Sequence, residues 1–540
     1  MDLAAWSLTR RLERLSDSRL VLLIAFVLFA LAAWPLLLVE LPPLQDLPNH
    51  VASVHILTHP DIYPEYASNG FFKSNSLLTL WLYAVGGHDL FWAARVFAAV
   101  VLAMNALALP LFVLRFAGRE RLLVAMLFVW PLVHPYFFAM GMLNFVLGVA
   151  LSLMLLTVLD LQRERATVWR GLGVAGLAML LWFAHPFPLV VVLALVGLHI
   201  VRRATWRERF ASARALLLPL LPVAVLTGLS VERHLVKADH APSFAAATFA
   251  YHNPWEILIH FWRDVSGALT GWGSMTLVPA VLLPVYAWRQ RRASRFFFST
   301  SAMVALAVLY VALPQMLSNW WHLNCRLVSF LWAGLALRLP ATLPRSLAAA
   351  LVACALAFSV VTGVDYVRLD RDRAAFTAGM DAVPERATLL PLIFKHSRPS
   401  EFTASLSHAW AYYTVKKNTS APLVFAVERS YPITYREFPP LALIPPALDR
   451  FAERNATPAR VCKSLGRFPV DATCVVVWRE LWEAFWRRAQ PRFSHVLTWA
   501  MPAEARSVIP LGYRRVFVAG ALDIYARIDT SPVPSNADRR

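Results

Sequence analysis

The sequence predicts a polytopic α-helical membrane protein, with about 11 transmembrane helices and a small C-terminal α/β domain outside the membrane. Its 540 residues are 58% hydrophobic and only 16% charged, whereas soluble proteins carry about 25% charged residues. Long apolar runs recur up to residue 364, and charged residues become frequent only after residue 365. We therefore divide the chain into a transmembrane domain, residues 1–365, and an extracytoplasmic domain, residues 366–540.

The first apolar run, residues 20–41, contains no charge before Glu40. About 20 such residues in a helix cross a hydrocarbon core of roughly 30 Å. The run is too long for the core of a cleavable signal peptide and is followed by two prolines, so we expect it to be retained. Ten further apolar runs lie at 91–114, 122–137, 139–159, 171–185, 187–201, 215–231, 274–288, 296–313, 327–340 and 346–364.

The basic residues indicate how these runs cross the membrane. The chain has 52 Lys and Arg against 33 Asp and Glu, and its arginines cluster on alternate loops between the apolar runs. Short cytoplasmic loops collect positive charge, so we expect a cytoplasmic N-terminus in a bacterial inner membrane, with loops 42–90, 232–273 and 314–326 and the C-terminal domain in the periplasm. No basic stripe lies on a soluble module, which argues against nucleic acid as a partner.

Residues 366–540 alternate short β-branched or aromatic runs with amphipathic stretches. These patterns predict strands at 387–394, 423–427, 474–478, 496–499 and 515–528, and a helix at 405–417. Cys462 and Cys474 lie in this region, on the side expected to be oxidising. They form either a disulfide or two free thiols.

The first outer loop carries the sequence Asp46-Leu47-Pro48-Asn49-His50. Proline near a helix start predicts a short helix on the membrane surface, with Asp46 at its first position and His50 one turn further on the same face. Asp46 then either caps the helix, a role worth about 1 kcal/mol, or lies at headgroup depth as a reactive carboxylate. The sequence leaves both interpretations open.

This arrangement resembles the type C (GT-C) membrane glycosyltransferases, and the five residues look like the Asp-x-Pro-x-His variant of bacterial members. The resemblance implies that Asp46 acts as a base or metal ligand. The second outer loop offers His134 where some members have an acidic residue, so Asp46 is the only ligand carboxylate that we expect for a divalent cation such as Mg or Mn, with His50 beside it.

The resemblance also implies a polyprenyl-phosphate sugar as donor, since nucleotide sugars are absent outside the inner membrane. An inverting hexosyl- or pentosyl-transferase of the cell envelope then needs one base, Asp46, and cations for the departing phosphate. Arg326 has the planar donor fork suited to phosphate and is expected to line one cavity with Asp46, although a juxtamembrane arginine also serves as a headgroup anchor. The other expected phosphate ligands are Lys73, Arg233 and Lys237, and the other expected cavity-lining residues are His134, His185, His322 and Trp321.

Two other functions remain open from the sequence. One is a lipid or solute transporter, which the absence of Asp, Glu and Lys from the interiors of the apolar runs disfavours. The other is a non-catalytic GT-C-like subunit of a polysaccharide assembly system. The chain has no Walker loop, which argues against an ATP-driven pump. The expected partners are membrane lipid, the lipid-linked sugar, and an acceptor that is a glycan, a lipid or a protein.

Overall fold

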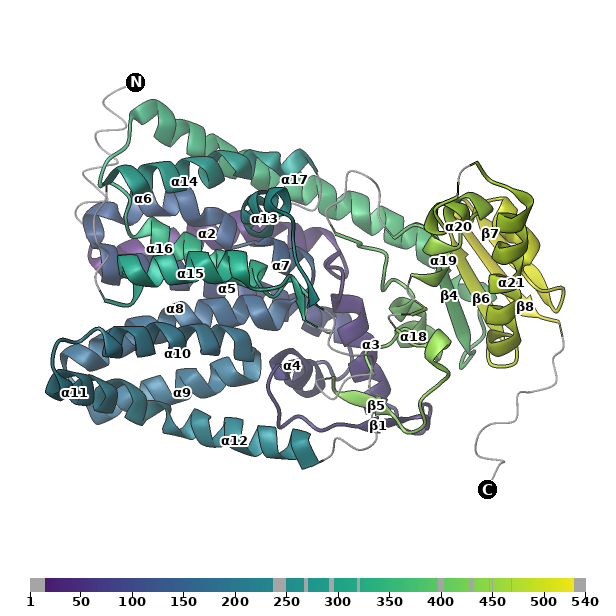
Figure 1. Ribbon diagram of the computed structural model, residues 1–540, viewed down its shortest axis with the longest axis horizontal. Coiled ribbons are helices and arrows are strands. Elements are labelled where there is room, and N and C mark those ends of the chain that lie inside the picture. The colour runs from purple at the N-terminus through teal and green to yellow at the C-terminus, as the bar shows by residue number, and fades with distance from the viewer. Residues whose placement is uncertain are drawn as a thin grey trace. The chain divides into compact units, whose positions relative to one another are not determined.

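The computed structural model forms two compact units (Figure 1). The first comprises Met1–Pro42, Phe72–Trp81 and Arg95–Tyr366, and the second comprises Pro43–Phe71, Leu82–Ala94 and Val367–Arg540. One boundary between the units lies between Tyr366 and Val367, and the others lie near residues 42, 71, 81 and 94. The structure describes residues 15–236, 249–266, 271–290, 296–317, 321–396, 403–426, 431–445, 447–448, 450–467 and 469–528.

Helices dominate the first 377 residues, and each predicted apolar run overlaps at least one of them. Their bounds are α2 Asp17–Ala33, η1 Trp34–Leu38, α4 Leu77–Val85, α5 Leu90–Ala117, α6 Arg119–Val129, η2 Trp130–Leu132, α7 Tyr136–Ala139, α8 Leu143–Glu164, α9 Val168–Ala184, α10 Pro186–Val201, α11 Trp206–Leu217, η3 Leu218–Leu220, α12 Leu221–Val236, α13 Pro254–Ser266, η5 Gly271–Thr276, α14 Leu277–Gln290, η6 Phe296–Phe298, α15 Thr300–Ala312, η7 Cys325–Leu327, α16 Val328–Ala336 and α17 Arg345–Thr377.

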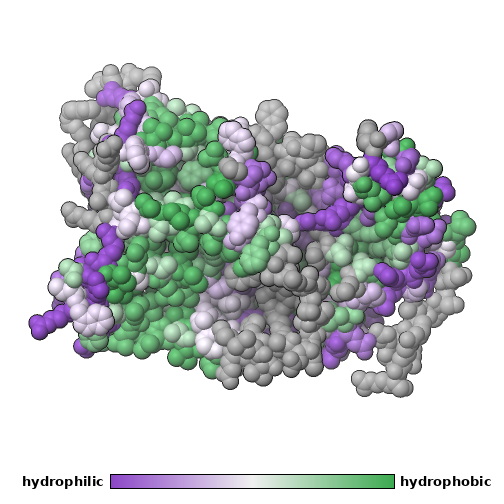
Figure 2. All heavy atoms as spheres, in the orientation of Figure 1, coloured by the Kyte–Doolittle hydropathy of each residue, from purple (hydrophilic) through white to green (hydrophobic). Residues whose placement is uncertain are grey.

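Six helical segments of the described chain are long and apolar enough to cross a membrane. They are Asp17–Leu38, Leu90–Ala117, Arg119–Ala139, Leu143–Glu164, Trp206–Ser230 and Arg345–Ala382. Four shorter apolar helices have 10–17 residues, so the predicted total of 11 stays a prediction. Large apolar side chains face outward from these helices, such as Phe26 at 67% and Val190 at 60% exposure, and Figure 2 shows hydrophobic residues gathered over this part of the surface. Such a surface fits lipid rather than water.

Within the first unit, α8, α9 and α10 lie side by side (Figure 1). A Cβ on Gly148 of α8 would stand 3.0 Å from Pro188 of α10, so glycine permits this close approach. Asn144, one turn earlier, accepts from Leu78 N (2.9 Å) and donates to Asn75 O (3.0 Å). An amide that satisfies backbone groups in an apolar interior stabilises packing, so Asn144 has a structural role.

The second unit contains a mixed four-stranded sheet in the order β4-β6-β8-β7. β4 (Leu389–Ile393) pairs in parallel with β6 (His495–Trp499), and β8 (Leu522–Arg527) is antiparallel to both β6 and β7 (Tyr513–Ala519). One face packs against Trp482 and Trp486, and the other against Phe376 and Tyr413. Alternate side chains of β4, β6 and β8 therefore enter two different cores.

The residues after Pro43 form two further elements of this unit, α3 (Leu47–Thr58) and β1 (Tyr66–Ser68), which contact elements from the C-terminal part of the chain. α3 packs against α18 (Ala411–Lys417), and β1 pairs with β5 (Ile433–Tyr435). The remaining helices are η8 Met380–Ala382, η9 Leu441–Leu443, α19 Phe451–Arg454, α20 Pro458–Ser464, α21 Ala472–Ala489 and η10 Glu504–Val508. A disulfide joins Cys462 of α20 to Cys474 of α21, which decides between the two alternatives left by the sequence.

Two predicted strands are wrong. Residues 474–478 belong to α21, because Asp471 caps this helix by accepting from Cys474 N (2.8 Å), and Trp478, Trp482 and Trp486 form a buried stripe at helical spacing. Residues 423–426 are turn and irregular chain. The predicted strand at 515–528 is the hairpin of β7 and β8, and the predicted helix at 405–417 begins only at Ala411.

Candidate functional site

Asp46 occupies the N-cap position of α3, but its side chain makes no capping hydrogen bond. Its backbone is helical (φ −90°, ψ −14°), unlike the extended conformation of a typical capping residue. The carboxylate is 17% exposed; Gln45 Nε2 donates to its Oδ1 at 3.3 Å, and His408 Nε2 lies 3.5 Å from the same oxygen. Helix capping therefore does not account for this carboxylate.

His408 is held in one tautomer by Asn49, which is buried in α3. Phe425 N donates to Asn49 Oδ1 (2.9 Å), and Asn49 Nδ2 donates to Leu423 O (3.0 Å), so backbone groups fix the orientation of the amide. The same Nδ2 lies 3.1 Å from His408 Nδ1, which must accept. In the neutral ring the proton is then on Nε2, the nitrogen that faces Asp46.

His50 follows Asp46 by one turn of α3, as the sequence predicts. Its ring centroid lies 5.5 Å from that of Phe425, which lies 5.1 Å from that of His408. Burial lowers the pKa of His50 to about 4, against the opposing effect of Asp46. His50 is therefore neutral at physiological pH.

The sequence does not indicate that Asn49 and His408 belong to this group. His408 lies 359 residues after Asn49 in the chain, in the stretch just before α18. Contacts such as His55 Nε2 with Asn418 Oδ1 (2.8 Å) and Tyr63 OH with Thr414 O (3.2 Å) hold α3 against the region of α18. No local pattern in the sequence indicates this pairing.

Arg326 lies in η7 of the first unit and is 7% exposed. Its Nη2 donates to Trp321 O (3.3 Å), and its guanidinium carbon is 5.2 Å from the centre of the Phe145 ring. Its Nη1 is 2.8 Å from His185 Nε2. The Nε of Arg326 has no hydrogen-bond partner among the described residues.

His185 places a second hydrogen-bond donor next to the guanidinium of Arg326. Phe187 N donates to His185 Nδ1 at 3.1 Å, so the proton of the neutral ring lies on Nε2, opposite the donor of Arg326. Two donors and a buried positive charge thus face one another. An anion is the ligand that such a group of donors stabilises most.

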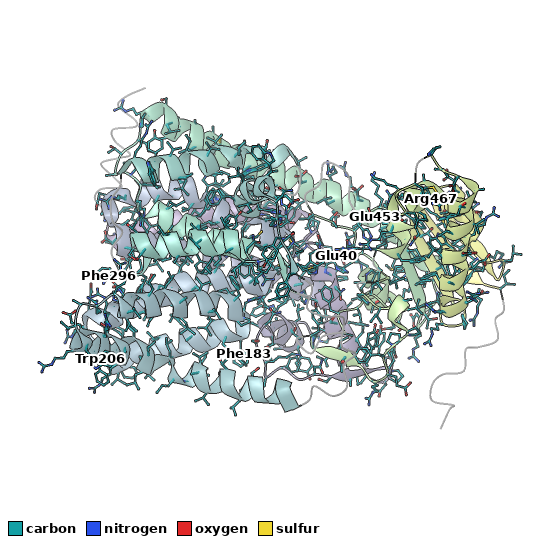
Figure 3. The ribbon with its side chains drawn as sticks, viewed as in Figure 1. Glu40, Phe183, Trp206, Phe296, Glu453 and Arg467 are labelled. Carbon is teal, nitrogen blue, oxygen red and sulfur yellow. A yellow bond between two sulfur atoms is a disulfide. The ribbon has the colours of Figure 1, made fainter. Side chains whose placement is uncertain are left out.

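Lys73 is 7% exposed in the same unit, and burial lowers its pKa to about 8. Three residues later, Ser76 N donates to the carbonyl of Phe183 (2.9 Å), which stands two positions before His185 and is labelled in Figure 3. The loop of Lys73 therefore contacts the end of α9. Arg233 belongs to α12, and Lys237 lies outside the described residues.

The other predicted cavity-lining residues are in the first unit. His134 is buried with Nε2 3.2 Å from Tyr366 OH, and His322 is buried at a left-handed turn (φ 56°) beside the rings of Tyr136 and Phe137. Trp321 is 37% exposed. A shared cavity with Asp46 stays a prediction, because Asp46 belongs to the second unit and Arg326 to the first.

No protein-family model and no curated protein matches the chain. Among solved structures, ArnT from Cupriavidus metallidurans bound to undecaprenyl phosphate has a TM-score of 0.52 at 12% identity, over 95% of this chain and 98% of that one. ArnT in the apo state has a TM-score of 0.50 at 12% identity, over 94% and 97% of the two chains. The mycobacterial arabinofuranosyltransferase AftD has a TM-score of 0.51 at 14% identity, over 95% of this chain but 42% of AftD.

The structural similarity to ArnT and AftD extends over almost the whole chain. That the chain belongs to the Asp-x-Pro-x-His variant stays a prediction. At such low identity the likeness concerns the fold. The chain has the fold of the type C (GT-C) membrane glycosyltransferases.

Proposed function

We propose that the chain is a membrane glycosyltransferase that moves a hexose or pentose from a polyprenyl-phosphate donor to an acceptor hydroxyl, with inversion, at the outer face of the bacterial inner membrane. The observation that carries the proposal is the Asp46 carboxylate, which does no capping and faces the Nε2 of a histidine whose tautomer Asn49 fixes. The shared fold with ArnT, whose structure contains undecaprenyl phosphate, supports the class of donor.

Asp46 acts as the general base in this reaction. It takes the proton of the acceptor hydroxyl as that oxygen bonds to the anomeric carbon of the sugar. The bond from this carbon to the phosphate oxygen breaks, and its electron pair leaves with polyprenyl phosphate. Since phosphate is a good leaving group, the reaction needs no second carboxyl group as a general acid, unlike glycoside hydrolysis.

Arg326 binds the phosphate of the donor. Its guanidinium is fixed by Trp321 O and the Phe145 ring, and its Nε lacks a partner in the described part of the chain. A fixed, desolvated arginine stabilises the charge that develops on the leaving phosphate without reorganising during the reaction. His185 contributes a second donor through Nε2.

A divalent cation at Asp46 is not part of the proposed mechanism. Mg²⁺ and Mn²⁺ prefer several oxygen ligands, but Asp46 belongs to no described group of three or more His, Cys, Asp or Glu donors that converge. The nitrogen that faces Asp46 from His408 carries a proton. These residues fit a base better than a resident metal ion.

The Asp46→Asn variant tests the proposal, because it keeps the size of the side chain and removes the base. In proteoliposomes with a panel of radiolabelled polyprenyl-phosphate sugars and envelope glycans, we expect transfer to fall at least about 100-fold. The matched control is Asp61→Asn, an exposed aspartate in the turn after α3. It should transfer sugar at the wild-type rate.

Full transfer by Asp46→Asn would contradict the proposed base. If the wild-type chain transfers no sugar from the panel, and a strain that carries Asp46→Asn keeps its envelope polysaccharides, the non-catalytic subunit becomes the better interpretation.

A further inference from the structure

A second group of reactive side chains lies in the first unit and takes no part in the proposed reaction. His252, His260 and Cys325 each direct one ligand atom toward the others, and these atoms all lie within 4.8 Å of one another. His260 is 5% exposed, Cys325 is fully buried, and the side chain of His252 is 3% exposed. Three buried metal-ligating side chains that converge in this way need a physical explanation.

Local structure brings the three residues together. β2 (Phe249–Ala250) pairs with β3 (Met316–Leu317), and Gln315 N donates to Ala250 O at 2.8 Å, so the chain before His252 is fixed beside the chain before Cys325. Tyr310 OH donates to Ile257 O (2.6 Å), which ties α15 to α13. Asn324 Nδ2 donates to the carbonyl of the same tyrosine (3.1 Å) and holds the residue before Cys325.

The spacing of the ligand atoms fits a tetrahedral ion. With Zn–S of about 2.3 Å and Zn–N of about 2.0 Å, a tetrahedral site places its sulfur and nitrogen about 3.5 Å apart. His252 Nε2 lies 3.7 Å from Cys325 Sγ, and the ring centroids of His252 and His260 are 4.0 Å apart. The separation of His252 Nε2 and Cys325 Sγ is therefore close to that in a tetrahedral zinc site.

His252 also has the outer partner that metal-binding histidines use. Its Nδ1 lies 3.2 Å from Glu256 Oε2, which leaves Nε2 for the ion. Glu256 is fixed in turn, because it accepts from Asn253 N while Glu256 N donates to Asn253 Oδ1, both at 2.9 Å. This reciprocal capping at the start of α13 orients the carboxylate behind the imidazole.

Contacts of His260 and Cys325 with other described residues compete with an ion at this place. Arg263 Nη2 lies 2.8 Å from His260 Nδ1 and 3.4 Å from its Nε2, and Cys325 Sγ donates to Asn324 Oδ1 at 3.3 Å. Binding therefore requires the guanidinium to turn away from His260 and the thiol to release its proton to solvent. The ring of Tyr136, 5.0 Å from the guanidinium carbon, offers Arg263 a second contact.

We propose that His252, His260 and Cys325 bind a zinc ion, with water in the fourth position. Two imidazoles and a thiolate in tetrahedral geometry select zinc over the oxygen-seeking Mg²⁺ and Ca²⁺. The ion joins α13 to η7, and η7 also carries Arg326. The zinc site depends on none of the residues that the proposed transfer reaction uses.

The experiment measures zinc in the full-length protein, purified in detergent through a tag without histidines. We expect about one zinc per chain after dialysis against zinc-containing buffer and removal of loosely bound metal. Replacing zinc with Co²⁺ should give the charge-transfer absorption of a cobalt–thiolate bond, which needs no variant. Cys325→Ser should abolish this absorption and lower zinc affinity at least 100-fold, whereas Cys354→Ser, at the other free cysteine, should change neither.

Two further variants test how residues next to the proposed ligands affect zinc binding. Glu256→Gln should weaken zinc binding about 10- to 100-fold, as loss of outer partners does at other sites. Arg263→Gln removes the competing guanidinium and should bind zinc at least as tightly as the wild type. Wild-type protein that retains no zinc, or cobalt protein without thiolate absorption, would overturn the proposal. Both readouts are independent of sugar transfer, so the zinc site and the transferase can fail separately.

Discussion

At the scale of single residues, His408 shows how the partners of a side chain define its chemistry. An isolated imidazole exchanges its proton between two nitrogens, but the backbone groups of Leu423 and Phe425 fix the amide of Asn49, and that amide fixes the ring. The proton then points toward Asp46. We infer that His408 is a positioning residue that holds the carboxylate for its proposed role as a base.

A pair of substitutions at His408 tests this role. The amide of His408→Gln can place a donor near the former Nε2, whereas His408→Leu removes the donor. A hydrogen bond to a charged group contributes about 1.5–3 kcal/mol, so we expect kcat to fall about 10- to 100-fold in the leucine variant. The glutamine variant should recover most of that loss. Equal loss in both variants, with unchanged folding, would argue against a donor role.

Arg326 is the residue on which proposed donor binding depends most. Arg326→Lys keeps the charge but loses the planar fork that binds two phosphate oxygens, so we expect kcat/KM for the lipid-linked sugar to fall at least about tenfold. Arg289→Gln, an exposed arginine at the end of α14, serves as the control. An unchanged kcat/KM in Arg326→Lys would favour the headgroup-anchor interpretation of this arginine.

At the scale of elements, α21 is a helix although its sequence includes residues that favour strands. Three consecutive valines follow Cys474, and β-branched residues favour strands. The aspartate cap, the buried tryptophan stripe and the disulfide to α20 all stabilise the helix instead. The tryptophans pack in a core whose residues range from Ala52 to Tyr525, and a window of a few residues does not contain these partners.

The disulfide of α20 and α21 should contribute measurably to the stability of the second unit. It links cysteines 12 residues apart, and closing a loop of about 15 residues stabilises a fold by about 3 kcal/mol. The double variant Cys462→Ser/Cys474→Ser should therefore unfold at a lower temperature in scanning fluorimetry of the detergent-solubilised protein. Cys354→Ser provides the control. An unchanged unfolding temperature in the double variant would show that packing alone holds these helices.

At the scale of the whole molecule, the distribution of arginines predicts which side of the membrane each loop occupies. The sequence places the loop of residues 202–209 in the cytoplasm and everything after residue 365 outside. Alkaline phosphatase, which folds only in an oxidising compartment, should be active when fused after residue 528 and inactive when fused after residue 204. The reverse pattern of activity would place the Asp46 loop in the cytoplasm as well and would remove the basis for a lipid-linked donor.

The sequence by itself determines the features that depend on composition and short-range spacing. Apolar length and charge predict the helices of the membrane part, Pro48 predicts the start of α3, and short apolar runs with β-branched or aromatic residues predict β4 and β6. These properties follow from the few residues in one turn or one strand. The number of membrane-spanning helices is less well determined, because short apolar helices such as α9 and α15 do not settle the count by length alone.

The tertiary structure alone decides which distant residues meet. His408 approaches Asp46, His185 approaches Arg326, and Cys325 approaches His252 and His260 only because packing of helices and short strand ladders joins segments that lie far apart in the chain. A search for histidines on adjacent turns overlooks the last group, since His252 and His260 are eight residues apart and Cys325 comes from another element. The sequence shows which reactive side chains the protein has. Their proximity, orientation and burial decide which reactions they take part in, and these properties arise only on folding.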